Sequence, residues 1–268
     1  MGIFKNISPL VLTRDEAPNI GRCLARLKWA RRVVVLDSGS ADDTVALARA
    51  FPNVSVHHRA FDNHTDQWNH GVGLVETPWV LSLDADYLLD DSLVAELQNL
   101  SPPDDIAAYF ISFRYCVFGR PLRGSLYPPR AALFRKDRAR YIDDGHTQLL
   151  EARGPTAFLR GLIWHDDRKS IAAWAANQVR YARLEANKLL SRDRGSLSRN
   201  DRIRRTGFLG PILVLPYCLL LKRGILDGWR GVYYAFQRLI AELLLGLFLI
   251  EARWGEAGER SGQGGGEG

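Results

Sequence analysis

The sequence predicts an α/β protein in which a mixed, mostly parallel sheet is flanked by helices and followed by a helical, membrane-associating appendage. Three observations carry this prediction. Short runs rich in valine and leucine alternate with helical patterns over the first hundred residues, in a βαβαβ order. Carboxylates follow the ends of three of these runs. The most apolar part of the chain comes last, directly after a cluster of arginines.

The first half supplies the predicted parallel strands. Strands are expected at 8–13, 32–36, 54–57 and in the run that ends at Asp84, with helices at 17–29, 42–51 and 65–75. Pro18 suits the first turn of a helix, where a missing N–H costs nothing. The run Ser40-Ala41-Asp42-Asp43 is typical of a capping box that opens the next helix.

The pattern changes after Pro102-Pro103. Apolar and polar residues alternate with period two over 109–115, which predicts a half-buried strand. Further strands are expected at 131–134 and 157–164. A long amphipathic helix is expected at 171–190. These elements complete a first domain over residues 1–190.

Two apolar segments follow an arginine-rich linker at 191–206. The segment 207–221 contains two prolines, and 232–250 is interrupted by Gln237, Arg238 and Glu242. Neither is an uninterrupted span of 20 apolar residues, so we expect interfacial or re-entrant helices over 207–254. A pair of core-packing helices is the alternative. The glycine- and glutamate-rich residues 255–268 are predicted to be disordered.

Charge and cysteine usage limit the classes of partner. The formal net charge is +6, and Ser191–Arg205 holds six arginines against two aspartates. A basic segment beside an apolar one favours an anionic membrane surface over a nucleic acid, with a solvated linker as the alternative. The three cysteines lack disulfide or zinc spacing, which favours a reducing compartment. We expect a cytoplasmic location, because too few residues precede the first strand for a signal peptide.

The chemistry centres on Asp84 and Asp86, at the end of the run 79–84. Open α/β sheets bind ligands at the carboxyl ends of their strands. Two carboxylates there suit Mg²⁺ or Mn²⁺, which can clamp a diphosphate. The alternative is a polar turn that caps the next helix.

Two neighbouring strand ends add candidates for a nucleotide site. Asp37 can accept a hydrogen bond from a base, Gly39 allows close backbone approach, and Arg14 can meet phosphate. Asp37 alone would also suit a phosphoacceptor of the response-regulator kind. The carboxylate pair after the fourth strand disfavours that alternative.

Four segments in this order resemble a family 2 glycosyltransferase of the GT-A (Rossmann-like) fold, close to the lipopolysaccharide-core β-glucosyltransferase type. They are Val11-Leu12-Thr13-Arg14-Asp15-Glu16, Val33-Val34-Val35-Leu36-Asp37-Ser38-Gly39-Ser40, Gln67-Trp68-Asn69-His70-Gly71 and Leu81-Ser82-Leu83-Asp84-Ala85-Asp86. The resemblance covers roughly residues 7–190. It implies that the nucleotide is bordered by Thr13, Arg14, Glu16 and Asp37. It also places Gln67 and Asn69 near the diphosphate or donor sugar, with Asp84 and Asp86 as the metal motif.

The resemblance further implies an inverting mechanism with a carboxylate base. The segment 141–148 lies where this subgroup often has Val-His-Glu, but Thr147 replaces the glutamate. Asp144 is the first candidate for the base and His146 the second, and a merely polar loop is the alternative. His165 is a candidate third metal ligand or, alternatively, a structural histidine.

Arginines after the fifth strand are candidates for binding acceptor phosphates, with a solvated basic loop as the alternative; they are Arg114, Arg120, Arg123 and Arg130.

The sequence thus predicts a metal-dependent hexosyltransferase that uses a nucleotide-sugar, a UDP-sugar by default, and a lipid-linked acceptor of the cell envelope. We expect it at the cytoplasmic face of the inner membrane as a peripheral or monotopic protein. Two rivals remain open. A non-catalytic membrane-associated scaffold is supported by Thr147, and a basic nucleic-acid-binding domain would show salt-sensitive binding without Mn²⁺.

Overall fold

The computed structural model describes residues 2–124, 126–144 and 147–262. It divides into two compact units, 2–121 with 126–169, and 122–124 with the residues from Ser170 onward. The predicted helix at 171–190 therefore groups with the second unit, whereas the sequence analysis places the first domain boundary at residue 190. Each unit is described separately below.

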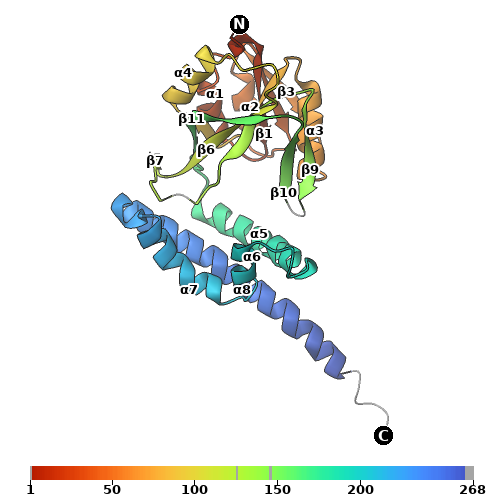
Figure 1. Cartoon of the computed structure of the whole chain (residues 1–268), viewed down its shortest axis with the longest axis vertical. Helices are drawn as coiled ribbons and strands as arrows, with labels where there is room; N and C mark the ends of the chain where they lie inside the picture. The colour runs from red at the N-terminus through yellow and green to blue at the C-terminus, as the bar shows by residue number, and fades with distance from the viewer. Residues whose placement is uncertain (1, 125, 145–146, 263–268) are drawn as a thin grey trace. The chain divides into compact units, whose positions relative to one another are not determined.

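The first unit is built on a nine-stranded sheet with the order β3-β2-β1-β4-β8-β6-β11-β5, with β7 paired to β6. Pairing is parallel from β3 to β4 and between β6 and β11, and antiparallel elsewhere (Figure 1). The strands are β1 (Ile7–Thr13), β2 (Val33–Asp37), β3 (Val54–His58), β4 (Trp79–Asp84), β5 (Tyr87–Leu89), β6 (Ala108–Val117), β7 (Arg120–Pro121), β8 (Arg130–Arg135) and β11 (Thr156–His165). A separate hairpin pairs β9 (Ala139–Asp144) with β10 (Thr147–Ala152). The mixed, mostly parallel α/β prediction is confirmed.

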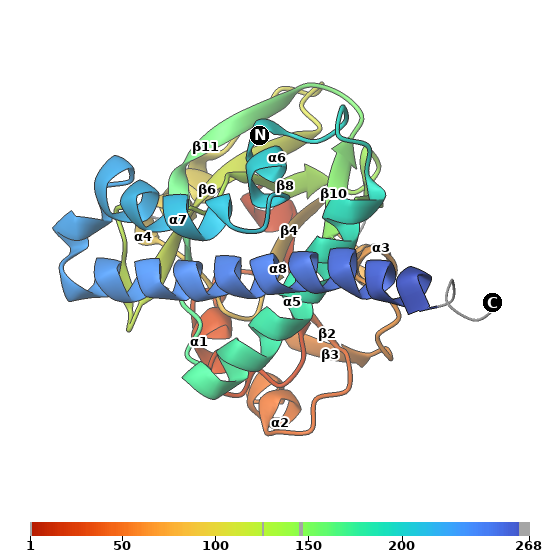
Figure 2. The ribbon, with the colours of Figure 1, turned by 90° about the horizontal axis from the view of Figure 1, so that it is seen from below.

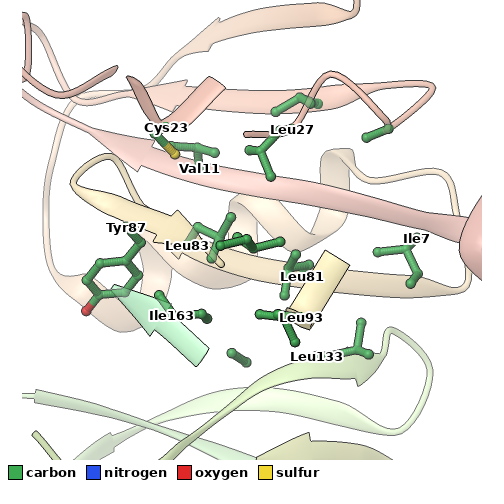
Figure 3. Close-up of a cluster of buried hydrophobic side chains, with 14 of the residues drawn as sticks. Ile7, Val11, Cys23, Leu27, Leu81, Leu83, Tyr87, Leu93, Leu133 and Ile163 are labelled. Atoms are coloured by element: carbon green, nitrogen blue, oxygen red, sulfur yellow. The ribbon is translucent and has the colours of Figure 1, made fainter. Parts of the chain in front are cut away.

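Helices cover both faces of this sheet. They are the short η1 (Phe4–Asn6), α1 (Ile20–Ala25), α2 (Thr44–Arg49), α3 (His64–Leu74) and α4 (Asp91–Asn99). One apolar cluster joins alternate strand residues such as Val11, Leu81 and Leu83 to Leu27 and Leu93 (Figure 3). A second cluster lies on the opposite face, around Trp68 of α3 and Tyr141 of β9. The period-two alternation of β1 and β4 therefore separates two cores.

The second predicted helix begins differently from the expectation. Its first residue is Thr44, and the Ser40 hydroxyl does not cap it. The Asp42 carboxylate instead accepts bonds from the Thr44 N–H and from the Ala17 N–H. The Ser40 hydroxyl accepts a hydrogen bond from the Asp15 N–H. The predicted capping box is wrong because these residues join two loops.

Gly161 allows β11 to pass close to α4. A Cβ at this position would overlap the backbone of Leu93. We expect Gly161→Ala to lower the free energy of unfolding by about 2 kcal/mol, as overpacking does in a dense core. Gly73→Ala, at an exposed site of α3 with open space around it, should raise it by up to about 1 kcal/mol. Urea denaturation measures both, and equal effects would contradict the close approach.

The second unit is helical. It contains α5 (Ile171–Ser191), α6 (Arg199–Arg204), α7 (Leu209–Pro216), the π-helical turn η2 (Tyr217–Leu221), the 3-10 turn η3 (Gly224–Asp227) and α8 (Trp229–Gly262). Its core packs α5 against α8 through Ala182, Ala186, Leu245 and Leu249. Helix α8 continues to Gly262, which overlaps the tail predicted to be disordered. Among the residues that the structure describes, no helix is sufficiently long and apolar to cross a bilayer.

Candidate active site

The predicted strand ends meet at one edge of the sheet. The parallel registers place Thr13 beside Asp37 and Leu12 beside Asp84. On the far side, β11 ends at His165, which pairs with Tyr87 of β5. Four strands thus deliver polar side chains to the same region, as the crossover connections of a parallel sheet require.

Asp86 and His165 form the centre of this region. His165 Nε2 lies 2.9 Å from Asp86 Oδ2, and the two side chains are 18% and 14% exposed. Burial works against the charge of both, but the pair outweighs it. The pKa of Asp86 is held below its usual value by the charge and hydrogen bond of His165, and the pKa of His165 is raised by Asp86.

Three buried polar atoms at this edge have no hydrogen-bond partner among the described residues: Asp86 Oδ1, His165 Nδ1 and Thr13 Oγ1. Buried polar groups are normally paired, so an unpaired set at one strand edge indicates a ligand position. All three residues are among the site residues predicted from the sequence.

Asp84 lies beside Asp86 in a setting that disfavours two negative charges. Burial, followed by the charge of Asp86, raises the pKa of Asp84, while Arg130 acts in the opposite direction. The Arg130 guanidinium lies 4.8 Å from the centre of the Tyr127 ring. The Tyr127 and Tyr87 hydroxyls are 2.7 Å apart, which links this arginine to the strand after the carboxylates.

Glu16 has a partner that the sequence analysis does not predict. Lys169 Nζ lies 2.5 Å from Glu16 Oε1, and the Asn19 amide donates both to Glu16 and to Asp167. Burial, followed by the charge of Asp86, raises the pKa of Glu16 to about 7, although Lys169 lowers it. Lys169 therefore brings a cation to the acidic edge. No sequence signal marks it, because the contact depends on the loop after β11 folding along the loop after β1.

The predicted Asp37–Gly39 turn is present, and Asp37 shapes it. Its carboxylate accepts bonds from the Gly39 and Ser40 N–H groups and from the Ser40 hydroxyl. Gly39 has a φ of +90°, which favours glycine. Arg14, in contrast, is 59% exposed and lies 4.0 Å from Asp15, so it is free to move toward a ligand.

Gln67 and Asn69 reach protein groups of the same region. The Gln67 amide donates to the Ser38 hydroxyl and to the Arg59 carbonyl beneath the turn after β2. The Asn69 amide makes two 2.9 Å bonds with the backbone of Tyr141 and ties α3 to β9. Their expected contacts with the diphosphate or donor sugar stay a prediction.

Of the two candidate bases, the structure places the backbone of Asp144, the last residue of β9 in the β9–β10 hairpin. Asp144 pairs with Thr147 in the backbone register. The Asp144 side chain and all of His146 lie outside the described residues. Asp143, the preceding residue, accepts a hydrogen bond from the Thr65 hydroxyl. This bond and the Asn69 bonds hold the hairpin on α3.

The predicted acceptor arginines separate in space. Tyr115 packs against the His165 ring at 5.0 Å between centroids, so Arg114, the preceding strand residue, faces the other side of the sheet. Arg120 is exposed on the short β7. Arg123 belongs to the second unit, where its N–H donates to Asp227. Of the other three, Arg130 lies beside the acidic pair.

The donor set decides how a divalent cation fits. No cluster of three or more His, Cys, Asp or Glu side chains within the described part of the chain is arranged to hold a metal ion. Mg²⁺ and Mn²⁺ are commonly held by one or two carboxylates together with substrate phosphates and water. The unpaired Asp86 Oδ1, with Asp84 beside it, suits that arrangement. The residues therefore fit a metal bound jointly with a diphosphate.

A sheet edge with a glycine turn, an Asp-x-Asp pair and unpaired buried polar atoms is the arrangement expected of a GT-A class transferase. The chain belongs to glycosyl transferase family 2, whose family model matches residues 8–157, more than half of its length. The lipopolysaccharide core biosynthesis glycosyltransferase LpsC of Rhizobium meliloti is 25% identical over 118 residues, 42% of this chain and 44% of LpsC. An uncharacterized glycosyltransferase of Rickettsia felis is 32% identical over 98 residues, 36% of this chain and 34% of that protein. The chain thus spans less than half the length of these relatives.

Solved structures to which this chain is similar include Staphylococcus aureus TarS residues 1–349 in complex with UDP-GlcNAc. It is 14% identical, with 93% of this chain and 92% of that chain covered and a TM-score of 0.49. Glucosyl-3-phosphoglycerate synthase from Mycobacterium tuberculosis, in complex with Mn²⁺, UDP and phosphoglyceric acid, is 15% identical. That match covers 70% of this chain and 80% of that chain, with a TM-score of 0.42.

Proposed function

We propose that this chain is an inverting, metal-dependent glycosyltransferase that moves a hexose from a UDP-sugar to a lipid-linked acceptor. The observation that carries the proposal is the buried Asp86–His165 pair beside Asp84, with unpaired buried polar atoms at the edge of the sheet. Burying the carboxylates of Glu16, Asp84 and Asp86 close together costs free energy, and a non-catalytic scaffold has no use for that arrangement. Membership of glycosyl transferase family 2 supports the same class of reaction.

In the proposed mechanism, an acceptor hydroxyl attacks the anomeric carbon while Asp144 takes its proton. One C–O bond forms to the acceptor as the C–O bond to the diphosphate breaks, which inverts the configuration. A divalent cation held by Asp86, with Asp84 nearby, would supply positive charge to the departing diphosphate. Arg130 and Lys169 add fixed cations close to the same carboxylates.

The acceptor and the location are also proposed. LpsC is named for lipopolysaccharide core biosynthesis, which supports a glycolipid acceptor in the cell envelope. The arginine-rich residues 191–206 and the apolar helices after them support a peripheral or monotopic position at the cytoplasmic face of the inner membrane.

Calorimetric titration of UDP, ADP and GDP, each with and without Mn²⁺, tests the donor site. We expect binding of UDP that requires Mn²⁺ and falls at least tenfold in Asp86→Ala, because the variant loses the carboxylate whose Oδ1 atom is unpaired. Asp104→Ala should bind like the parent. It removes a fully exposed carboxylate beside Arg135, which pairs with Trp79 at the opposite end of β4 from Asp84.

Two outcomes would redirect the proposal. A folded sample that binds no nucleotide would favour the scaffold function. Binding of RNA or DNA that weakens steeply with salt and ignores Mn²⁺ would favour the nucleic-acid function.

A further inference from the structure

The outer side of helix α8 is apolar, although polar side chains of the same helix are buried within the helical unit. From Trp229 to Ile250 of α8, the exposed side chains are all large and apolar, and Gln237 and Glu242 are buried at 8% and 6% exposure. The exposed residues are Trp229, Phe236, Ile240, Leu243, Leu247 and Ile250. Their spacing of seven, four, three, four and three residues keeps them on one side of the helix.

A buried ion-pair network accounts for the inward position of Glu242. Arg204 of α6 donates to Glu242 at 3.0 Å and lies 2.6 Å from Glu185 of α5. Arg238 lies 3.8 Å from the same Glu242 carboxylate. The charges that interrupt the apolar segment 232–250 are therefore compensated within the unit. They leave the outer side of α8 free of negative charge up to Glu251.

The neighbouring elements continue this surface. Helix α7 lies along α8 (Figure 2), and Gly246 allows the contact because a Cβ there would overlap the Gly207 carbonyl. The apolar face is defined here as the six residues of α8 above together with the exposed apolar residues of α7, η2, η3 and the residue before them. The latter are Phe208, Leu209, Ile212, Leu213, Tyr217, Leu220, Leu221, Ile225 and Leu226. An exposed surface of this extent marks an interaction site.

Positive charge surrounds the turn between η2 and α8. Residues 192–253 hold eleven Lys and Arg against five Asp and Glu. Their net charge of +6 equals the formal net charge of the whole chain. Lys222 lies over the Tyr217 ring and Arg230 over the Trp229 ring, at 5.7 and 4.6 Å from the ring centres. The acid of this turn, Asp227, is occupied by the Arg123 and Gly124 N–H groups. Aromatic rings beside Lys and Arg are typical of the boundary between lipid headgroups and acyl chains.

We propose that the apolar face docks into an anionic phospholipid surface, with α8 lying in the plane of the membrane and the Leu220–Trp229 turn inserted among the acyl chains. A second copy of the chain would also cover apolar residues, but it would bring the same excess of cations against this one. Anionic headgroups complement those cations instead. The inference deepens the proposed function by naming the surface that would bring the transferase to its lipid-linked acceptor.

Vesicle flotation of the full chain tests the proposal. We expect strong binding to phosphatidylcholine vesicles that contain phosphatidylglycerol, weak binding to pure phosphatidylcholine, and a loss of binding with added salt. Leu221→Glu and Leu247→Glu, at positions 74% and 63% exposed, should each weaken binding at least about tenfold. Leu47→Glu, on exposed α2 of the first unit, should bind like the parent.

Further measurements keep the outcomes distinct. Nucleotide titration of the same variants should be unchanged, so failure of vesicle binding and failure of the donor site are told apart. If a variant unfolds, a second measurement replaces its flotation. Brominated lipid should quench the tryptophan fluorescence of the parent protein, and the quenching should be smaller in Trp229→Phe. Absent quenching, or unaltered flotation of Leu221→Glu and Leu247→Glu, would overturn the proposal. If these variants lose a dimer that the parent forms in sedimentation, while their flotation is unaffected, the apolar face would instead bind a second copy of the chain.

Discussion

Asp144→Asn is expected to reduce sugar transfer by about 10²–10⁴-fold while nucleotide binding stays at the parental level. An asparagine amide cannot take the proton of the acceptor hydroxyl, and a positioned general base contributes a factor of this size. The proposed donor site lies at the ends of β1, β2, β4 and β11, and the β9–β10 hairpin supplies none of those elements. Release of the nucleoside diphosphate in the presence of acceptor measures turnover, and calorimetry measures binding.

Asp143→Asn is the matched control for this variant. The Asp143 carboxylate accepts a hydrogen bond from the Thr65 hydroxyl, and an asparagine oxygen can accept the same bond. Transfer should therefore remain within a few-fold of the parent. Near-normal turnover in Asp144→Asn would remove Asp144 from the mechanism. A large loss in His146→Gln alone would give the role of base to His146.

The central strands could be predicted from sequence because each is a short apolar run that ends in a distinctive polar residue. β2 is buried at all five positions, and β4 at every position before Asp84. Continuous apolar runs of that length are typical of parallel strands buried on both faces. The meeting of Thr13, Asp37 and Asp84 at one edge follows from this arrangement, and the registers confirm it.

The contacts between the loops around this edge could not be predicted. Asn19 contacts Asp167 across 148 positions of sequence, and Lys169 meets Glu16 across 153. Such contacts depend on how two loops fold over the finished sheet edge, and no local pattern encodes that path. Asn69 shows the converse, because its motif resembles a ligand contact while the structure bonds its amide to β9.

The C-terminal helices show a different limit. Gln237, Arg238 and Glu242 interrupt an apolar segment in the sequence, and this interruption is the reason to expect interfacial or re-entrant helices there. The structure turns Glu242 inward, because Arg204 of α6 compensates it there. A hydropathy pattern reports the spacing of polar residues but not which side of the helix a partner covers.

Asp166→Ala is expected to lower the free energy of unfolding by about 3 kcal/mol, because breaking a buried ion pair leaves its partners uncompensated. The Asp166 carboxylate is 3% exposed and pairs with Arg22 and Arg168, and it also accepts the Gly119 N–H. These contacts join α1, the loop after β6 and the segment after β11. Urea denaturation measures the loss.

Asp62→Ala provides the comparison. Asp62 is 68% exposed and lies 3.2 Å from Arg59, so its removal should cost less than about 1 kcal/mol. A loss in Asp166→Ala as small as the one expected for Asp62→Ala would show that the Asp166 network does not stabilise the fold.

Asp166 also bears on the donor site, because it directly follows His165 and its N–H donates to the Asp86 carbonyl at 3.0 Å. Loss of its side chain frees the segment that holds the Asp86–His165 pair. Mn²⁺-dependent nucleotide affinity should therefore fall several-fold under conditions where Asp166→Ala remains folded. Asp166→Asn keeps an oxygen that can accept from Arg168, so it should lie between the parent and Asp166→Ala in both measurements. Unchanged affinity in a destabilised but folded Asp166→Ala would confine the network to stability and separate it from the binding edge.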